Sequence, residues 1–219
     1  MTAQRPKFRR KAATIRKQAL VDATIEVVAE AGVRAATVRA IAERAGVTQG
    51  LIRHHFSSKE DLVAAAYGHH MARMTDTVWR ATGDPADAPG LRLSRFVAAA
   101  LAPPVMSADW VALWAGFLGE TLHDERLGRI HDESYRAFRD LLEHLIGEVR
   151  ADAGRPADGP ERRRLAIAGN AVIDGLWLEG AALQESFGAA EIAAMGIGAI
   201  AAILGVALPM PDEIEGTQR

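Results

Sequence analysis

Apolar residues recur at helical spacing along almost the whole chain, and this pattern restricts the fold more than any other feature of the sequence. From Ile15 onward the apolar positions fall three and four residues apart, as on one face of an α-helix. No segment shows a sustained alternation of apolar and polar residues, so we expect no β-strands. The pattern predicts an all-α protein of about nine helices, built as an N-terminal three-helix domain and a C-terminal helical bundle.

Glycines and capping residues divide the N-terminal part into short helices. Gly32 and Gly46 interrupt the apolar pattern, and Thr37, Thr48 and Ser58 stand where new helices would begin. These signals predict one helix before Gly32, two short helices after Thr37 and Thr48, and a longer fourth helix after Ser58. The fourth and later helices are expected at about residues 58–79, 91–101, 107–121, 124–152, 160–185 and 189–206.

Basic residues are concentrated at the N-terminal end of the chain. Residues 1–59 contain twelve Lys or Arg and four Asp or Glu, a net charge of +8, whereas the remainder carries a net charge of −10. A basic head on an acidic body suits a module that binds phosphates, although a basic tail can also be merely solvated. The expected parts are a flexible basic arm (1–13), a basic three-helix domain (14–58), a helical body (59–206) and a tail (207–219).

The segment TVRAIAERAGVTQGLIRHHFSSKEDL, residues 37–62, joins two short helices through a tight turn at Gly46. Ala42, Val47 and Ile52 are spaced to hold these helices together at a steep angle, which is the pattern of a helix-turn-helix. The second helix is too short to be stable alone and must pack on its neighbours. Its other face is then free to enter a DNA major groove about 12 Å wide.

Side chains on that free face have the chemistry to read base edges. Gln49 can pair with adenine and Arg53 with guanine, each through two hydrogen bonds, and Gly50 allows the backbone to approach closely. Thr48 can cap the helix and contact a phosphate, and Lys59 is placed to clamp another. The expected DNA contacts are Thr37, Thr48, Gln49, Gly50, Arg53, His54 and Lys59. The simpler alternative is a short surface helix with ordinary polar residues.

The N-terminal segment resembles the DNA-binding domain of the TetR family of bacterial repressors. Three pieces carry the resemblance: EAG at Glu30–Gly32, the T-x-x-x-I-A-x-x-A-G-V run at Thr37–Val47, and the H-F-x-x-K-E-x-L run at His55–Leu62. The family commonly has a Tyr-Tyr or Tyr-Trp pair where this chain has Arg53–His54. The resemblance implies a sequence-specific repressor that binds a double-stranded DNA operator and is released from it by a small-molecule effector. It also implies an effector pocket in the C-terminal helices.

The C-terminal part resembles a narrower branch, the BetI-like regulators, at Trp110–Trp114 and Asp174–Ala181. Choline-responsive control of glycine betaine synthesis is known within that branch, which makes a choline-like cation one candidate effector. Aromatic faces and carboxylates suit such a ligand. The expected pocket residues are Trp79, Met106, Trp110, Trp114, Phe117, Glu120, Asp174 and Trp177. Aromatic residues at helical spacing are also common in protein cores, and that alternative stays open.

The last two expected helices, from Leu165 to Leu183 and from Ile192 to Val206, are rich in small and apolar residues. The resemblance implies that they form a homodimer, and such helices can pack across a twofold axis, although both could instead be buried within one chain. A dimer is favoured because a single short recognition helix reads few bases. Two copies would read half-sites about 34 Å apart, or a multiple of that distance.

Several classes of protein are disfavoured by the composition. The chain has no cysteine, and it contains neither an apolar run long enough to span a membrane nor a secretory signal, so we expect a cytoplasmic protein. No metal-ligand or catalytic spacing is evident, and we expect no metal, no cofactor and no enzymatic activity. Two alternatives to a ligand-controlled repressor remain. One is a DNA-binding regulator controlled by a protein partner or by no ligand, and the other is a helical enzyme with a nucleic-acid-binding head.

Overall fold

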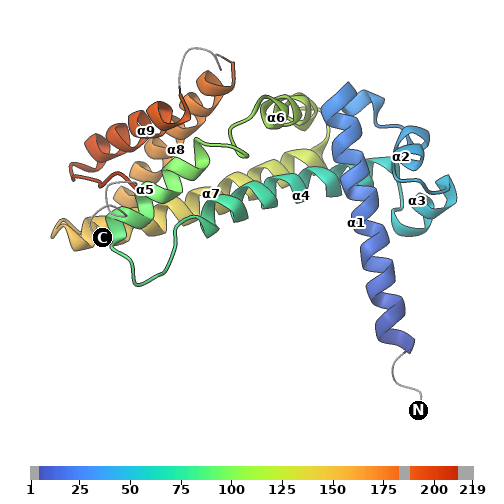
Figure 1. Cartoon of the computed structure of the whole chain (residues 1–219), viewed down its shortest axis with the longest axis horizontal. Helices are drawn as coiled ribbons and strands as arrows, with labels where there is room; N and C mark the ends of the chain where they lie inside the picture. Colours follow the sequence, from blue (N-terminus) through green and yellow to red (C-terminus); the bar gives the residue numbers. More distant parts are fainter. Residues whose placement is uncertain (1–4, 183–187, 212–219) are drawn as a thin grey trace. The chain divides into compact units, whose positions relative to one another are not determined.

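The computed structural model describes residues 5–182 and 188–211. Within these ranges the chain forms nine α-helices and one short 3-10 helix, without a strand, which confirms the predicted fold class (Figure 1). The helices group into two compact units. The first contains residues up to Ala72 together with Ala112–Asp132, and the second contains Arg73–Val111 together with the described residues from Glu133 onward.

The first unit opens with α1, Arg5–Ala31, which begins well before the apolar pattern does. Residues 5–13 are therefore helical, and this corrects the expected flexible arm; residues 1–4 lie outside the described part of the chain. Lys, Arg and Ala are strong helix formers, and Pro6 falls in the first turn, where a missing N–H breaks no hydrogen bond. The helix stops at Gly32, whose φ of 80° favours glycine. A 3-10 helix, Val33–Ala35, follows.

Two short helices come next, as predicted: α2, Val38–Arg44, and α3, Gln49–His55. The contacts join α1 to α2 and α2 to α3, and the three helices lie side by side in Figure 1. The apolar side chains of Ile41 and Ile52 are almost completely buried. These contacts explain how a seven-residue helix stays ordered, because its stability comes from packing on its neighbours and not from its own length.

The rest of the first unit is built from parts of three longer helices: α4, Lys59–Arg80; α6, Ala108–Thr121; and α7, Glu125–Asp152. All three run from one unit into the other. Tyr67 of α4 is completely buried, stacks on Phe117 of α6 with ring centroids 4.6 Å apart, and has its hydroxyl 2.7 Å from Nδ1 of His131 in α7. Burial raises the pKa of Tyr67 to about 12 and lowers the pKa of His131, which favours the neutral form of both side chains in this hydrogen bond.

The second unit is organised around α5, Pro89–Ala100, α8, Gly159–Ala182, and α9, Ala189–Leu204, each of which contacts the other two. Gly180 of α8 allows a close approach to α9, since a Cβ atom there would lie only 2.6 Å from Ile192 Cδ1. Of the expected tail, residues 207–211 are described and pass over α5 near Gly90, and the remainder lies outside the described residues. Among the described helices, none has the length and apolarity needed to cross a bilayer.

Candidate nucleic-acid interface

The turn between α2 and α3 is closed by backbone hydrogen bonds around Gly46. The Val47 N–H donates to the Ala42 carbonyl over 3.0 Å, and the Gly46 N–H donates to the Glu43 carbonyl over 3.2 Å. These two bonds form a Schellman motif, which requires a left-handed residue, and Gly46 has a φ of 63°. The turn therefore fixes the direction in which α3 leaves α2.

Helix α3 has one buried side and one exposed side. Ile52, and Phe56 immediately after the helix, are buried in the first unit. All five residues that the sequence places on the reading face are exposed: Thr48, Gln49, Gly50, Arg53 and His54. The structure thus brings these five residues together on one accessible surface.

Two threonines were expected near helix starts, and they behave differently. The Thr37 hydroxyl oxygen accepts the Ala40 N–H over 3.1 Å, so Thr37 caps α2 as predicted. Thr48 occupies the N-cap position of α3, but its side chain makes no capping hydrogen bond. The Leu51 N–H donates to the Thr48 carbonyl oxygen, over 3.0 Å. The expected cap by the Thr48 hydroxyl is corrected accordingly.

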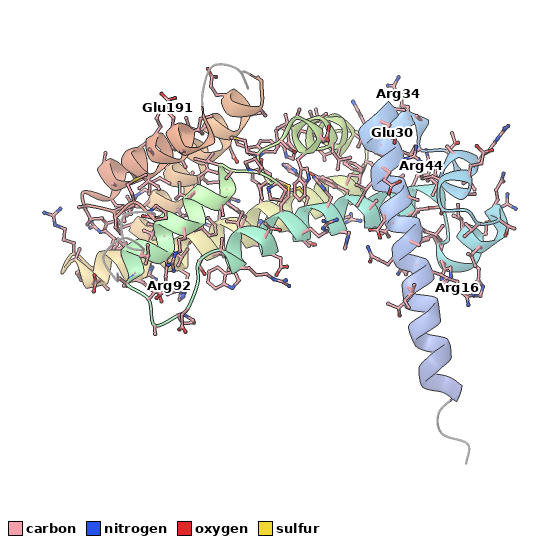
Figure 2. The ribbon with its side chains drawn as sticks, in the orientation of Figure 1. Arg16, Glu30, Arg34, Arg44, Arg92 and Glu191 are labelled. Atoms are coloured by element: carbon pink, nitrogen blue, oxygen red, sulfur yellow. The ribbon has the colours of Figure 1, made fainter. Side chains whose placement is uncertain are left out.

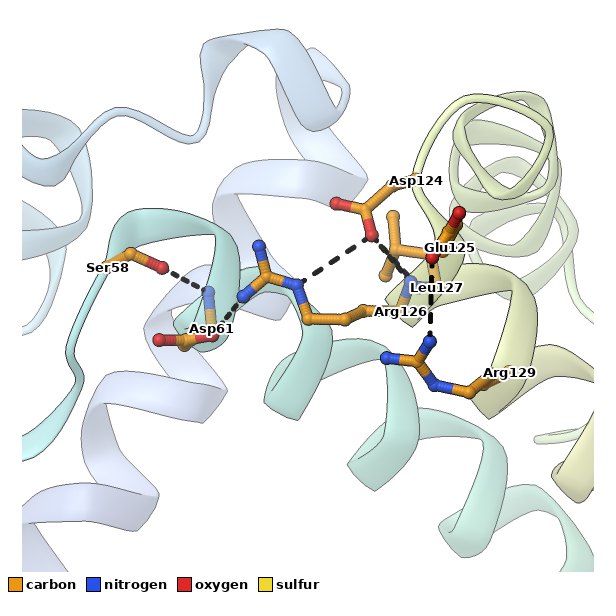
Figure 3. Close-up of polar contacts among 7 residues, drawn as sticks. All are labelled: Ser58, Asp61, Asp124, Glu125, Arg126, Leu127 and Arg129. Atoms are coloured by element: carbon orange, nitrogen blue, oxygen red, sulfur yellow. Dashed lines mark hydrogen bonds and ion pairs between the residues drawn. The ribbon is translucent and has the colours of Figure 1, made fainter.

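The start of α4 lies next along the chain and carries Lys59. The Ser58 hydroxyl accepts the Asp61 N–H over 3.0 Å and caps this helix. The Asp61 carboxylate pairs with Arg126 at the start of α7 (Figure 3). Lys59 is half-buried, and its ammonium group is 3.7 Å from the Glu60 carboxylate. This is a loose ion pair that a stronger anion could displace.

Arg44 has a structural role that the sequence analysis missed. Its guanidinium donates to Glu30 over 2.8 Å and to Glu26 over 3.2 Å, and so links the end of α2 to the last turns of α1 (Figure 2). The hydrogen bond from Arg44 lowers the pKa of Glu30. The two partners lie 18 and 14 residues away in the sequence, so no local spacing could have identified them.

The sequence analysis also missed that basic residues of α1 lie close to the end of α3. Lys17 of α1 places its ammonium 5.2 Å above the ring of Phe56, and the rings of His54 and His55 are 5.1 Å apart. The pKa of His55 is lowered by desolvation first, and then by the positive charges of His54, Arg16 and Lys17. Arg16 and Lys17 were counted only as part of a basic arm and helix, because sequence distance hides their proximity to α3.

The expected effector residues are divided between the two units. Trp114, Phe117 and Glu120 belong to the first unit, and Trp79, Met106, Trp110, Asp174 and Trp177 belong to the second. Phe117 is completely buried against Tyr67, as a core residue would be.

Within the second unit, Trp79 lies against His144, with ring centroids 6.4 Å apart. Trp177 is buried, and its indole N–H donates to the Val105 carbonyl over 2.8 Å, next to Met106. Asp174 lies one turn before Trp177 on α8 and accepts a hydrogen bond of 2.7 Å from Asn170. Burial raises the pKa of Asp174 to about 6. No group of three or more His, Asp or Glu side chains in the described part of the chain is placed to hold a metal ion.

Two family models match the chain. Residues 20–66 match the model described as bacterial regulatory proteins, tetR family, and residues 89–205 match the C-terminal domain of BetI-type transcriptional repressors. The HTH-type transcriptional regulator BetI of Burkholderia thailandensis is 33% identical over 168 residues, which cover 76% of this chain and 82% of that relative.

Solved structures share the fold. A transcriptional regulator from Pseudomonas aeruginosa PAO1 superposes with a TM-score of 0.78 and 30% identity, over 86% of this chain and 90% of that chain. The transcriptional regulator FadR from Bacillus subtilis, in complex with stearoyl-CoA, superposes with a TM-score of 0.64 and 18% identity, over 87% of this chain and 98% of that chain. The matched motifs, the two family matches and the three-dimensional similarity agree: this chain belongs to the TetR family of bacterial regulatory proteins, with a C-terminal domain of the BetI type.

Proposed function

We propose that this protein is a transcriptional repressor that reads its operator with α3 and is released from it by a small-molecule effector. The observation that carries the DNA-binding part is the exposed polar face of α3, held outward because Ile52 and Phe56 are buried on the opposite side. A rigid helix with one polar face is the element that enters a major groove in helix-turn-helix proteins. The role is regulatory and not catalytic.

The side chains around α3 divide into base readers and phosphate contacts. Gln49 and Arg53 have the donor and acceptor geometry for two-bond pairing with adenine and guanine, respectively. Thr37 and Lys59 flank α3 and would contact phosphates, which fix the register of the protein on DNA without reading its sequence. The Thr37 oxygen already accepts the Ala40 N–H, and its hydroxyl hydrogen can still be donated to a phosphate oxygen.

Pairing of two copies through α8 and α9 would present two recognition helices together. Three large apolar side chains on these helices are exposed: Ile167 (46%), Leu178 (42%) and Met195 (40%). Two exposed glycines lie about one helical turn from these side chains, Gly175 before Leu178 and Gly198 after Met195, and would allow the helices of two subunits to approach closely. An exposed apolar face of this kind is typical of an interface, and a second copy of the chain is the occupant that twofold operator reading requires.

For the effector we propose the second unit. In the B. subtilis protein this fold holds stearoyl-CoA, so the architecture can accommodate a small molecule. Here the half-buried carboxylate of Asp174 and the ring of Trp177 lie one turn apart on α8, a combination of acid and aromatic face that suits a cation. Helix α4 begins in the first unit and ends in the second, so one continuous helix connects the DNA-binding unit to the unit of the proposed effector site. A ligand that favours the state unable to bind DNA would shift the population away from the operator.

The test of DNA reading compares two substitutions on two duplexes, one from the protein's own promoter region and one scrambled. Arg53→Ala should cost about 1–3 kcal/mol on the promoter duplex and much less on the scrambled one. Lys59→Ala should weaken both equally and lower the slope of log K against log salt by about 1. Equal losses for Arg53→Ala on both duplexes would refute its role as a base reader.

The effector proposal is tested by melting temperature with choline chloride, and with sodium acetate as the anionic control. Stabilisation by choline that is lost in Asp174→Asn supports the cation site. If a compound stabilises the protein but leaves promoter affinity unchanged at saturation, release by that compound is excluded.

A further inference from the structure

Four basic side chains gather where α1 passes the C-terminal end of α3. Arg16 and Lys17 belong to α1, and His54 and His55 are the last two residues of α3. Arg16, Lys17 and His54 are exposed, and His55 is half-buried. Figure 2 labels Arg16 on α1, along the part of the helix that lies beside the short helices. We call these four residues the basic cluster.

Contacts to the protein, and not charge alone, hold the basic cluster together. The Lys17 ammonium lies over the ring of Phe56, the residue that ends α3, so a cation–π contact keeps this lysine beside the histidines. His54 and His55 meet edge to face, with their planes 74° apart. The cluster therefore combines two helices that are far apart in the sequence.

The surroundings of His55 contain like charges without a compensating acid. Its pKa is lowered by desolvation and by His54, Arg16 and Lys17, and no described carboxylate offsets them. The carboxylates of α1, α2 and α4 that have printed ion pairs face other cations. Glu26 and Glu30 bind Arg44, Glu43 binds Arg39, Asp61 binds Arg126, Glu60 lies near Lys59, and Asp22 lies near His69. The cluster thus lacks an anion that would neutralise it within the described chain.

We propose that Arg16, Lys17, His54 and His55 form one binding site for a backbone phosphate of DNA, and that this site takes up protons when it binds. The inference rests on the proposed function, because it assumes that α3 approaches DNA. A phosphate would replace repulsion among the four groups by attraction, and an anion near an imidazole favours its protonated form. The lowered pKa of His55 favours its neutral form in free protein, and a bound phosphate would favour its charged form.

The sign of the pH effect follows from this linkage. If the histidines bind protons more tightly in the complex than in free protein, DNA binding takes up protons, and affinity rises as the pH falls. Each histidine can contribute at most about tenfold per pH unit. Because a phosphate carries no base identity, the effect should be the same on promoter and scrambled duplexes.

The experiment measures the Kd of the full chain for both duplexes at pH 6.0 and 7.5, at fixed salt. The wild type should bind both duplexes at least about fivefold more tightly at pH 6.0. The double variant His54→Gln/His55→Gln should lose this difference. The matched control is His123→Gln, an exposed histidine of the same unit outside the cluster, which should retain the difference. Melting curves establish that each variant is folded, and the single variant His55→Gln serves if the double variant is not.

A second pair of variants tests the two cations of α1. Arg16→Gln/Lys17→Gln should lower the slope of log K against log salt by about 1–2, whereas Arg34→Gln, just beyond the other end of α1, should leave it unchanged. The outcomes separate the two proposals. Promoter preference without any pH effect, or a pH effect that survives in the histidine variants, overturns the phosphate site alone. Absence of promoter preference at both pH values overturns the proposed function.

Discussion

Arg126, in the first turn of α7, pairs with Asp61, in the first turn of α4, although the two residues are 65 positions apart (Figure 3). The backbone N–H of Asp61 is also capped by Ser58, so one aspartate joins the start of α4 to α7. The Asp61 side chain is 35% exposed and the Arg126 side chain 43%, which limits the free energy that the ion pair can contribute. The pair ties the first turn of α4 to the first turn of α7 within the first unit.

A double-mutant cycle with Asp61→Asn and Arg126→Ala should therefore give a favourable coupling free energy below about 1 kcal/mol. The measurement is urea unfolding of the wild type, both single variants and the double variant. The matched control is the same cycle on Arg129 and Glu125, because their contact is long, at 3.9 Å, and Glu125 is highly exposed. A coupling no larger than that between Arg129 and Glu125 would show that the Asp61–Arg126 pair does not stabilise the start of α4.

Gly46 is the residue on which the turn of the helix-turn-helix depends. Gly46→Ala should destabilise the protein by about 1–2 kcal/mol, because alanine in a left-handed conformation is strained even though the space around Gly46 is open. Gly46→Asn should cost less. The control is Gly50→Ala, since Gly50 is helical and a Cβ atom there would meet nothing closer than 3.9 Å. Equal unfolding free energies for Gly46→Ala and wild type would contradict the role of the turn.

Arg44 should behave as a structural residue and not as a DNA contact. Because its guanidinium is engaged by Glu26 and Glu30, Arg44→Gln should leave the salt dependence of DNA binding unchanged while lowering the stability of the protein. Salt titrations of binding to the scrambled duplex and thermal melts make the comparison. A slope reduced by about 1, as predicted for Lys59→Ala, would instead assign Arg44 to the phosphate contacts.

The proposed dimer face predicts a change in oligomeric state. Met195→Glu places a charge on the exposed apolar face of α9 and should convert the dimer to monomer at micromolar concentration, as measured by sedimentation velocity. Leu122→Glu makes a comparable substitution at a residue that is 84% exposed and lies between α6 and α7, and it should leave the assembly unchanged. A Met195→Glu variant that sediments like the wild type would remove α9 from the interface.

Asp174 should make stability depend on pH in an unusual direction. Its pKa is about 6 in the folded protein, against an ordinary value of 3.8, so the folded form binds the proton more tightly than the unfolded form. Its ionisation therefore costs stability as the pH rises from about 4 through 6. Asp174→Asn removes this cost. The melting temperature of the variant minus that of the wild type should therefore increase as the pH rises from 5 to 7.5. A constant difference across this range would contradict the raised pKa.

Local sequence signals located most of the helices because their causes are local. Apolar spacing sets the helical faces, and Gly32 and Gly46 end helices through backbone conformations that other residues rarely adopt. Thr37 and Ser58 cap the helices that follow them, as predicted. The exposed face of α3 was also predictable, since burying Ile52 leaves Gln49 and Arg53 on the other side of a helix.

The start of α1 was mispredicted because it was located from apolar spacing alone. Residues 5–13 are helical and rich in Lys, Arg and Ala, which favour a helix through intrinsic propensity, and apolar periodicity does not detect such a segment. The grouping of the effector candidates stays a prediction. Helical spacing placed Trp110 and Phe117 on one face of α6, but it carried no information about which compact unit each would join.

The sequence by itself determined the helical class, the helix-turn-helix and the residues that face outward from α3, because these depend on backbone conformation and on neighbours within one or two turns. Only the tertiary structure decided that Arg44 binds Glu30, that Arg126 binds Asp61, and that Lys17 lies over Phe56. Each of these contacts joins residues that are 14 to 65 positions apart. The packing of helices sets such distances, and the pattern of residues along any one helix does not encode them.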